Sequence, residues 1–411
     1  MTRHKLLLAI SLLSKIGTGM VSLFVLARGL GPADYGFVAT VFAYASIAAL
    51  FTDFGFSVQA LRDIGAQPDK AGELIAACVR VKNLLVLVVT LGAALVLSLL
   101  NLGPHLLAAS LLLYGSIMVN SYGDLVVVAL RGIGKYAAET VSSILGTVVF
   151  VIVVGGTALA WPDILPIATA LFVARLLQTA IAFLVVSRYT QLGNCIHGPL
   201  LDLLRFMRTS SGLALDSFLT TITGQIDVIL VGALLGLHAA GTYQIAARVA
   251  SYAVLPAQVL AGVNIPALSR DMSDHGRVKT PLIARFFLEY LAIGTVVAVG
   301  YAVFMATFSQ LVFGTGYEIS VGLWSGFCLL VLVRYLSAST GVLLIIYKQV
   351  RWRLIVQFLA ACAIAGLVTL FSLAWGVAGA AWALATSILL AGILYAWGVF
   401  RIQRESNRYS L

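Results

Sequence analysis

The most constraining feature of this sequence is a series of long apolar segments separated by short clusters of glycine, proline and charged residues. A helix that crosses a membrane needs about 20 mostly apolar residues. Of the 411 residues, 61% are hydrophobic and only 10% are charged, and the mean hydropathy is +1.03. This number of apolar residues is enough to form about twelve spanning helices. The composition excludes a soluble enzyme, a secreted disulfide scaffold and a disordered chain.

Breaks between the apolar segments predict where each helix begins and ends. They contain the glycines, prolines and charges that interrupt helices, as in Gly29–Pro32 and Trp375–Gly376. We therefore expect an all-α polytopic membrane protein. Its helices are predicted at about 6–27, 33–57, 74–100, 105–130, 138–160, 164–187, 210–235, 241–265, 283–308, 320–346, 354–374 and 377–400.

The basic residues fall on alternate connections. Of the 26 Lys and Arg, 21 lie in the N-terminal segment, the C-terminal tail and every second connection, whereas Arg28 alone lies in the opposite set. Lys and Arg collect on the cytoplasmic side of membrane proteins. The sequence thus predicts a multi-pass membrane protein with both termini in the cytoplasm. The same distribution explains the formal charge of +10 without a nucleic-acid partner.

The connections leave no room for a catalytic domain. Outer connections are a few residues long, and the longest inner one, 188–209, has about 22 residues, roughly one helix length. The four cysteines, Cys78, Cys195, Cys328 and Cys362, have no metal-ligand spacing. We expect neither an enzyme nor a bound metal or cofactor.

A shift of 205 residues superimposes Gly31–Gly36 on Gly236–Gly241, and each segment lies between two apolar helices. Six helices precede the central basic connection and six follow it. The pattern predicts two six-helix lobes related by a parallel pseudo-two-fold repeat. The expected domains are an N-terminal lobe at 1–190, a cytoplasmic linker at 191–209, and a C-terminal lobe with its tail at 210–411.

Four cations interrupt the apolar segments: Lys15, Arg175, Arg248 and Arg334. At a rise of 1.5 Å per residue, three of them lie about 14 to 21 Å into their helices, and Arg248 lies about 10 Å from the outer face. Each such charge costs about 3 kcal/mol at the centre of a span. We expect them to line a water-filled central cavity that binds an anionic ligand. The structural alternative is that each cation is neutralised by helix-end carbonyls or by a carboxylate, as in a pair of Arg248 with Asp227.

Acidic side chains are fewer at this depth. Asp53 and Asp124 lie near predicted cytoplasmic ends, while Asp216 and Asp227 lie deeper in one helix. These four are the candidates for binding a coupling H⁺ or Na⁺.

Three segments carry a family resemblance. They are Arg28-Gly-Leu-Gly-Pro-Ala-Asp-Tyr-Gly36, Asp53-Phe-Gly55 with Arg62, and Asp227-Val-Ile-Leu-Val-Gly232 leading to Gly241-Thr-Tyr243. With the span count and the half-repeat, they resemble the polysaccharide biosynthesis transporters, which are O-antigen-type lipid-linked oligosaccharide flippases. That family belongs to the superfamily that also holds the multidrug and toxin extrusion exporters and the peptidoglycan lipid flippases.

The resemblance implies a flippase that moves an undecaprenyl-diphosphate-linked oligosaccharide, a unit of lipopolysaccharide O-antigen, capsule or exopolysaccharide, across a bacterial inner membrane by alternating access. It also implies contact with membrane lipid and cooperation with an envelope polysaccharide polymerase and glycosyltransferases. The alternatives are a cation-coupled multidrug or metabolite exporter of the same superfamily, and a non-transporting enzyme or assembly component for the cell envelope.

Overall fold

The computed structural model describes residues 3–99, 103–191, 215, 217–275, 280–314, 316–347 and 349–408, with the side chains of 3–16 and a few other helical positions left undescribed. The described chain is helical and contains no strand. It divides into two compact units, Met1–Thr221 and Ile222–Leu411. Most of the predicted linker at 191–209 lies outside the described residues, so its bounds stay a prediction.

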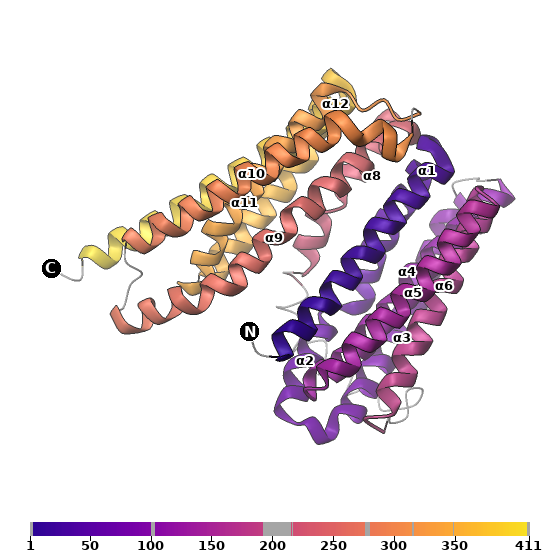
Figure 1. Cartoon of the computed structure of the whole chain (residues 1–411), viewed down its shortest axis with the longest axis horizontal. Coiled ribbons are helices and arrows are strands. Elements are labelled where there is room, and N and C mark those ends of the chain that lie inside the picture. The colour runs from indigo at the N-terminus through magenta and orange to yellow at the C-terminus, as the bar shows by residue number, and fades with distance from the viewer. Residues whose placement is uncertain are drawn as a thin grey trace. The chain divides into compact units, whose positions relative to one another are not determined.

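The first unit contains six long or medium helices and one short turn of helix (Figure 1). They are α1 (Arg3–Asp53), α2 (Phe56–Ala66), η1 (Pro68–Lys70), α3 (Ala71–Leu99), α4 (Pro104–Gly132), α5 (Tyr136–Ala160) and α6 (Ile164–Ser187). Helix α6 packs against α4 and α5, and α5 packs in turn against α1. Small residues allow the close contact of α4 with α6, since Gly115 faces Phe172 and Gly123 faces Thr179.

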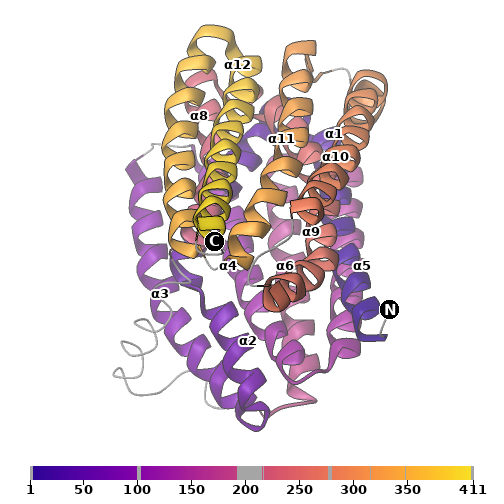
Figure 2. The same cartoon turned by 90° about the vertical axis from the view of Figure 1, so that its left-hand side faces the viewer.

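The second unit contains α8 (Ile226–Leu235), α9 (Leu237–His275), α10 (Thr280–Phe313), α11 (Val321–Ile346) and α12 (Val350–Arg408). Helix α11 packs against α9, α10 and α12, and α8 packs against α9 and α12 (Figure 2). Ser320 caps the start of α11 by accepting a hydrogen bond from the amide of Leu323.

The described residues hold nine helices that are long and apolar enough to cross a membrane. Two of them, Gly17–Ala66 and Arg351–Gln403, have 50 and 53 residues, more than twice the length of one span. Each contains a non-helical break, at Gly31 and at Trp375–Gly376 respectively. Helix α9, with 39 residues, is also of spanning length. Nine candidates, two of them double, together with α9 give the twelve spanning helices that the sequence predicts.

Large apolar side chains on the outer faces are consistent with lipid contact. On α3, Leu87, Leu91 and Leu95 recur every four residues and all remain more than half exposed. Because lipid cannot hydrogen-bond to a backbone, helices that satisfy their own amides are the expected way to cross it.

The boundaries differ from the sequence prediction at three places. The second predicted helix, 33–57, ends at Asp53, and the expected loop after it contains α2. Phe54 and Gly55 form the break with positive φ angles of 40° and 77°. The seventh predicted helix, 210–235, is interrupted at residues 224–225, before α8 begins. The eighth continues ten residues beyond its predicted end, to His275.

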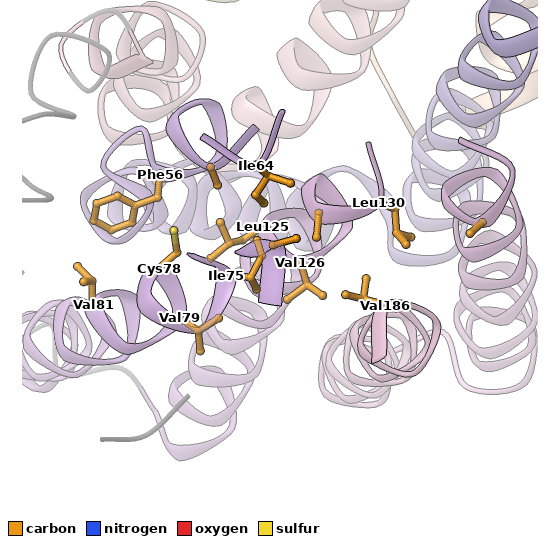
Figure 3. Close-up of a cluster of buried hydrophobic side chains, with 14 residues drawn as sticks. Phe56, Ile64, Ile75, Cys78, Val79, Val81, Leu125, Val126, Leu130 and Val186 are labelled. Carbon is orange, nitrogen blue, oxygen red and sulfur yellow. The ribbon is translucent and has the colours of Figure 1, made fainter. Parts of the chain in front are cut away.

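Helix α2 forms because one of its faces is apolar. Phe56, Ala60 and Ile64 recur at helical spacing and are buried against α3 and α4 (Figure 3). Their neighbours include Cys78 of α3 and Leu125 of α4. The cluster fixes this end of the first unit, where Asp53 is located.

The two halves share one unusual backbone conformation at equivalent positions. Gly31 has φ 75° and ψ 173°, and Gly236, 205 residues later, has φ 88° and ψ 172°. Only glycine adopts this region readily. The same break therefore separates the first two helices of each half, as the repeat predicts.

We expect Gly31→Ala to destabilise the first unit by about 1–3 kcal/mol, because an alanine at this φ and ψ is strained. Gly29→Ala is the matched control, since its added Cβ would lie 3.7 Å from the Ala158 carbonyl oxygen, an ordinary contact. Thermal unfolding of the purified protein in detergent measures both variants. Equal unfolding temperatures for the two would contradict a conformational requirement at residue 31.

Candidate functional site

Arg175 is held in the first unit by neutral side chains. It lies on α6, and its Nη1 donates hydrogen bonds to Asn120 Oδ1 at 2.9 Å and to Gln178 Oε1 at 2.8 Å. Its guanidinium carbon lies 4.6 Å from the centre of the Phe150 ring. Amide oxygens orient a guanidinium without cancelling its charge. This arrangement leaves a fixed positive charge on a spanning helix.

Asn120 connects Arg175 to an acid. Its Nδ2 donates to Asp124 Oδ2 at 2.9 Å, one turn further along α4. Asp124 is exposed, and its carboxylate interacts electrostatically with the Arg175 guanidinium. The Asn120 amide bridges the two groups. Within the described residues the ion pairs do not include Arg175.

Asp53 forms an ion pair at the end of α1. Its carboxylate accepts a hydrogen bond from Lys82 Nζ at 2.9 Å, and Lys82 is 0% exposed, whereas Asp53 is 29% exposed. Lys82 also donates to the Ser121 carbonyl oxygen at 3.0 Å. A lysine buried this completely needs a carboxylate partner. Asp53 therefore has a structural role, which the sequence analysis did not consider for it.

Asp227 is buried in the first turn of α8. Its Oδ1 accepts from the Val228 amide at 2.9 Å, and its Oδ2 accepts from the Tyr243 hydroxyl at 2.8 Å. A carboxylate at a helix N-terminus is also stabilised by the helix dipole. The break at residues 224–225 creates this N-terminus in mid-span.

A cavity of about 40 Å³ lies beside Asp227 within the second unit. We call it the Arg334 cavity. Its lining includes Asp227, Gln244, Arg248, Ser251, Phe327 and Arg334. With the Gln244 amide oriented so that its oxygen faces Arg248, that oxygen lies 2.7 Å from Nε and 3.2 Å from Nη2.

Arg334 differs from the other cations on spanning helices. It lies on α11 and is partly exposed, and its electrostatic neighbours are Asp227 and Tyr243. Among the described residues no hydrogen bond or ion pair joins its guanidinium to another side chain. It is one of the residues that line the cavity.

The structure thus brings three of the predicted site residues together: Asp227, Arg248 and Arg334 line one cavity of the second unit. In the first unit Arg175 and Asp124 share the side chain of Asn120, whereas Asp53 pairs with Lys82. The side chains of Lys15 and Asp216 lie outside the described residues. A central cavity shared by all four cations stays a prediction, as does the coupling role of the acids.

Sequence reasoning missed the partners of the arginines. Gln178 follows Arg175 by three positions and Gln244 precedes Arg248 by four, so each pair shares a helix face. A glutamine three or four positions from an arginine in an apolar helix could therefore have been predicted from the sequence to be its partner. Within the part of the chain that the structure describes, no group of three or more His, Cys, Asp and Glu is placed to hold a metal ion.

Comparison with known proteins assigns the family. A family model described as "Polysaccharide biosynthesis protein" matches residues 3–272, more than half of the chain. The chain belongs to this family, and the resemblance carried by the sequence motifs is confirmed. A search of curated proteins found no match.

Solved structures with the same fold are transporters of the MOP superfamily. An inward-facing multidrug resistance MATE family transporter gives a TM-score of 0.70 at 15% identity, covering 94% of this chain and 96% of the other. The outward-facing conformation of such a transporter gives 0.62 at 16%, covering 98% and 97%. A MOP superfamily transporter from Pyrococcus furiosus Vc1 (DSM3638), described with a binding pocket of reverse polarity, gives 0.62 at 15%, covering 97% and 96%.

These matches show that the chain has the fold of those transporters. Its long apolar helices make it a multi-pass membrane protein.

We expect Asp53→Asn to destabilise the first unit by about 3 kcal/mol, because Lys82 keeps a buried charge without its carboxylate. The double variant Asp53→Asn/Lys82→Met should recover most of that loss, since neither charge remains. Thermal unfolding in detergent measures both. A double variant no more stable than Asp53→Asn would show that the ion pair is not the cause.

Proposed function

We propose that this protein is a flippase for an undecaprenyl-diphosphate-linked oligosaccharide in a bacterial inner membrane. The observation that carries the proposal is the positive charge of Arg175, held on a spanning helix by the amides of Asn120 and Gln178 and not by a carboxylate. The family, whose description is polysaccharide biosynthesis, supports a cargo of this chemistry.

The chemistry of the cargo explains why such a charge is useful. A bare diphosphate in hydrocarbon pays a very large desolvation cost. A guanidinium offsets that cost because its planar fork pairs with two phosphate oxygens at once. The polyprenyl tail stays in lipid, while the diphosphate and the sugars cross between the two lobes by alternating access.

We assign direct contact with the diphosphate to Arg175 and Lys15. The Arg334 cavity, at about 40 Å³, is far smaller than the roughly 300–1,000 Å³ typical of a small-molecule pocket. Contact of the cargo with Arg248 and Arg334 therefore requires a conformation in which this cavity is wider. H⁺ or Na⁺ coupling is proposed for Asp53, Asp124, Asp216 or Asp227, and at Asp53 it would compete with the ion pair to Lys82.

Arg175→Glu is expected to abolish translocation, and Arg175→Gln to reduce its rate at least tenfold, about 1.4 kcal/mol of lost stabilisation. The measurement is translocation of lipid-linked oligosaccharide in vesicles containing the purified protein. Arg62→Glu is the control, because Arg62 is 69% exposed and its charge reversal leaves the helix interiors unchanged. Wild-type rates in Arg175→Glu would exclude a role for this charge in carrying the cargo.

A second candidate function is a cation-coupled multidrug or metabolite exporter. The buried carboxylate of Asp227 and the fold shared with multidrug transporters favour it. The same vesicles distinguish the two functions. Gradient-driven export of a cationic dye that is lost in Asp227→Asn would favour the exporter, and transport of lipid-linked oligosaccharide alone would favour the flippase.

Cooperation with a polysaccharide polymerase and with glycosyltransferases is part of the same proposal. It follows from the cargo, since one class of enzyme must build the lipid-linked unit and another must consume it on the outer face. No catalytic step is assigned to this chain.

A further inference from the structure

Charges around the Arg334 cavity do not balance. Two guanidinium groups, Arg248 and Arg334, border it, and Asp227 is the one carboxylate among its lining residues. The other polar side chains of the lining, Gln244 and Ser251, are neutral. The lining therefore carries one net positive charge, on two arginines that are both partly buried.

Asp227 and Arg334 are not directly paired. Both carboxylate oxygens of Asp227 accept hydrogen bonds, one from the Tyr243 hydroxyl and the other from the Val228 amide. The ion pairs of the described residues, which extend to 4.0 Å, do not join Asp227 to Arg334. The donors of Arg334 are thus available to another acceptor.

The space beside them limits what that acceptor is. A water molecule needs a cavity volume of about 10–15 Å³. The Arg334 cavity, at about 40 Å³, therefore has room for about three waters. A sugar diphosphate does not fit in that space, whereas a single halide ion with a water does. Arg248 has donors beyond the two that face Gln244, because a guanidinium has five N–H groups.

We propose that the Arg334 cavity is a binding site for a small monovalent anion of halide size, chloride in the cell. Arg334 supplies the principal hydrogen bonds and Arg248 the second positive charge. Asp227 weakens the site by repulsion and sets its affinity. The bound anion offsets the net positive charge of the cavity lining. The proposal does not depend on the cargo of the transporter.

Thermal unfolding tests the site on the full-length protein in detergent. At constant ionic strength, replacing sodium gluconate by sodium chloride or bromide should raise the unfolding temperature in a saturable way. Arg334→Gln should raise the apparent Kd for halide at least tenfold. Arg62→Gln is the matched control, because that exposed arginine lies outside the cavity lining, and it should keep the wild-type halide dependence.

Asp227→Asn keeps an acceptor for Tyr243 and removes the repulsion, so it should bind halide more tightly than the wild type. This variant tests the proposal even where Arg334→Gln fails to fold. Bromide soaked into crystals of the wild-type protein provides an independent measurement, with an anomalous peak expected beside the Arg334 guanidinium.

Three results would overturn the proposal. One is an unfolding temperature that does not depend on halide, together with no bromide peak beside Arg334. Another is equal halide affinity in the wild type and Asp227→Asn. The third is stabilisation by pyrophosphate but not by halide, which would assign the cavity to the cargo. None of these measurements uses translocation. The proposal of an anion site can therefore be rejected without rejecting the flippase function, and the reverse also holds.

Discussion

The free-energy cost of placing a charge in hydrocarbon governs where each polar side chain of this protein lies. Lys82 is completely buried and is accompanied by the carboxylate of Asp53. Arg175 has two amide oxygens and the face of an aromatic ring. Arg334 has a small polar cavity in place of a partner. These three arrangements differ in how much positive charge they leave uncompensated. An uncompensated positive charge is what an anionic ligand binds.

The helices and their breaks could be predicted from the sequence because they depend on the local order of residues along the chain. Apolar length predicts a span, and the clusters at Gly31 and Trp375–Gly376 predict an interruption that the structure contains. The amphipathic α2 was missed because its apolar face is only three turns long and lies between Gly55 and Pro68, in a segment that reads as a loop.

The candidate site could be predicted less completely from the sequence, because its geometry depends on contacts between residues that are far apart in the chain. The depth of Arg175 follows from counting along one helix, but its partner Asn120 is 55 positions away. Lys82 and Asp53 both read as charges at cytoplasmic helix ends, and only the packing of α3 on α1 and α4 shows that they form a buried pair. The sequence predicts one continuous helix over 210–235, and only the structure shows that a break at residues 224–225 places Asp227 at the start of a new helix.

The matching backbone angles at Gly31 and Gly236 have a consequence for the design of the two halves. The residues that flank them differ, with Pro32 and Asp34 in the first half and Leu237 and Ala239 in the second. The direction of the chain at this break thus depends on the glycine and not on its neighbours. Side-chain chemistry can therefore differ between the halves without a change of backbone, as it does between an arginine bonded to two amides and an arginine beside a cavity.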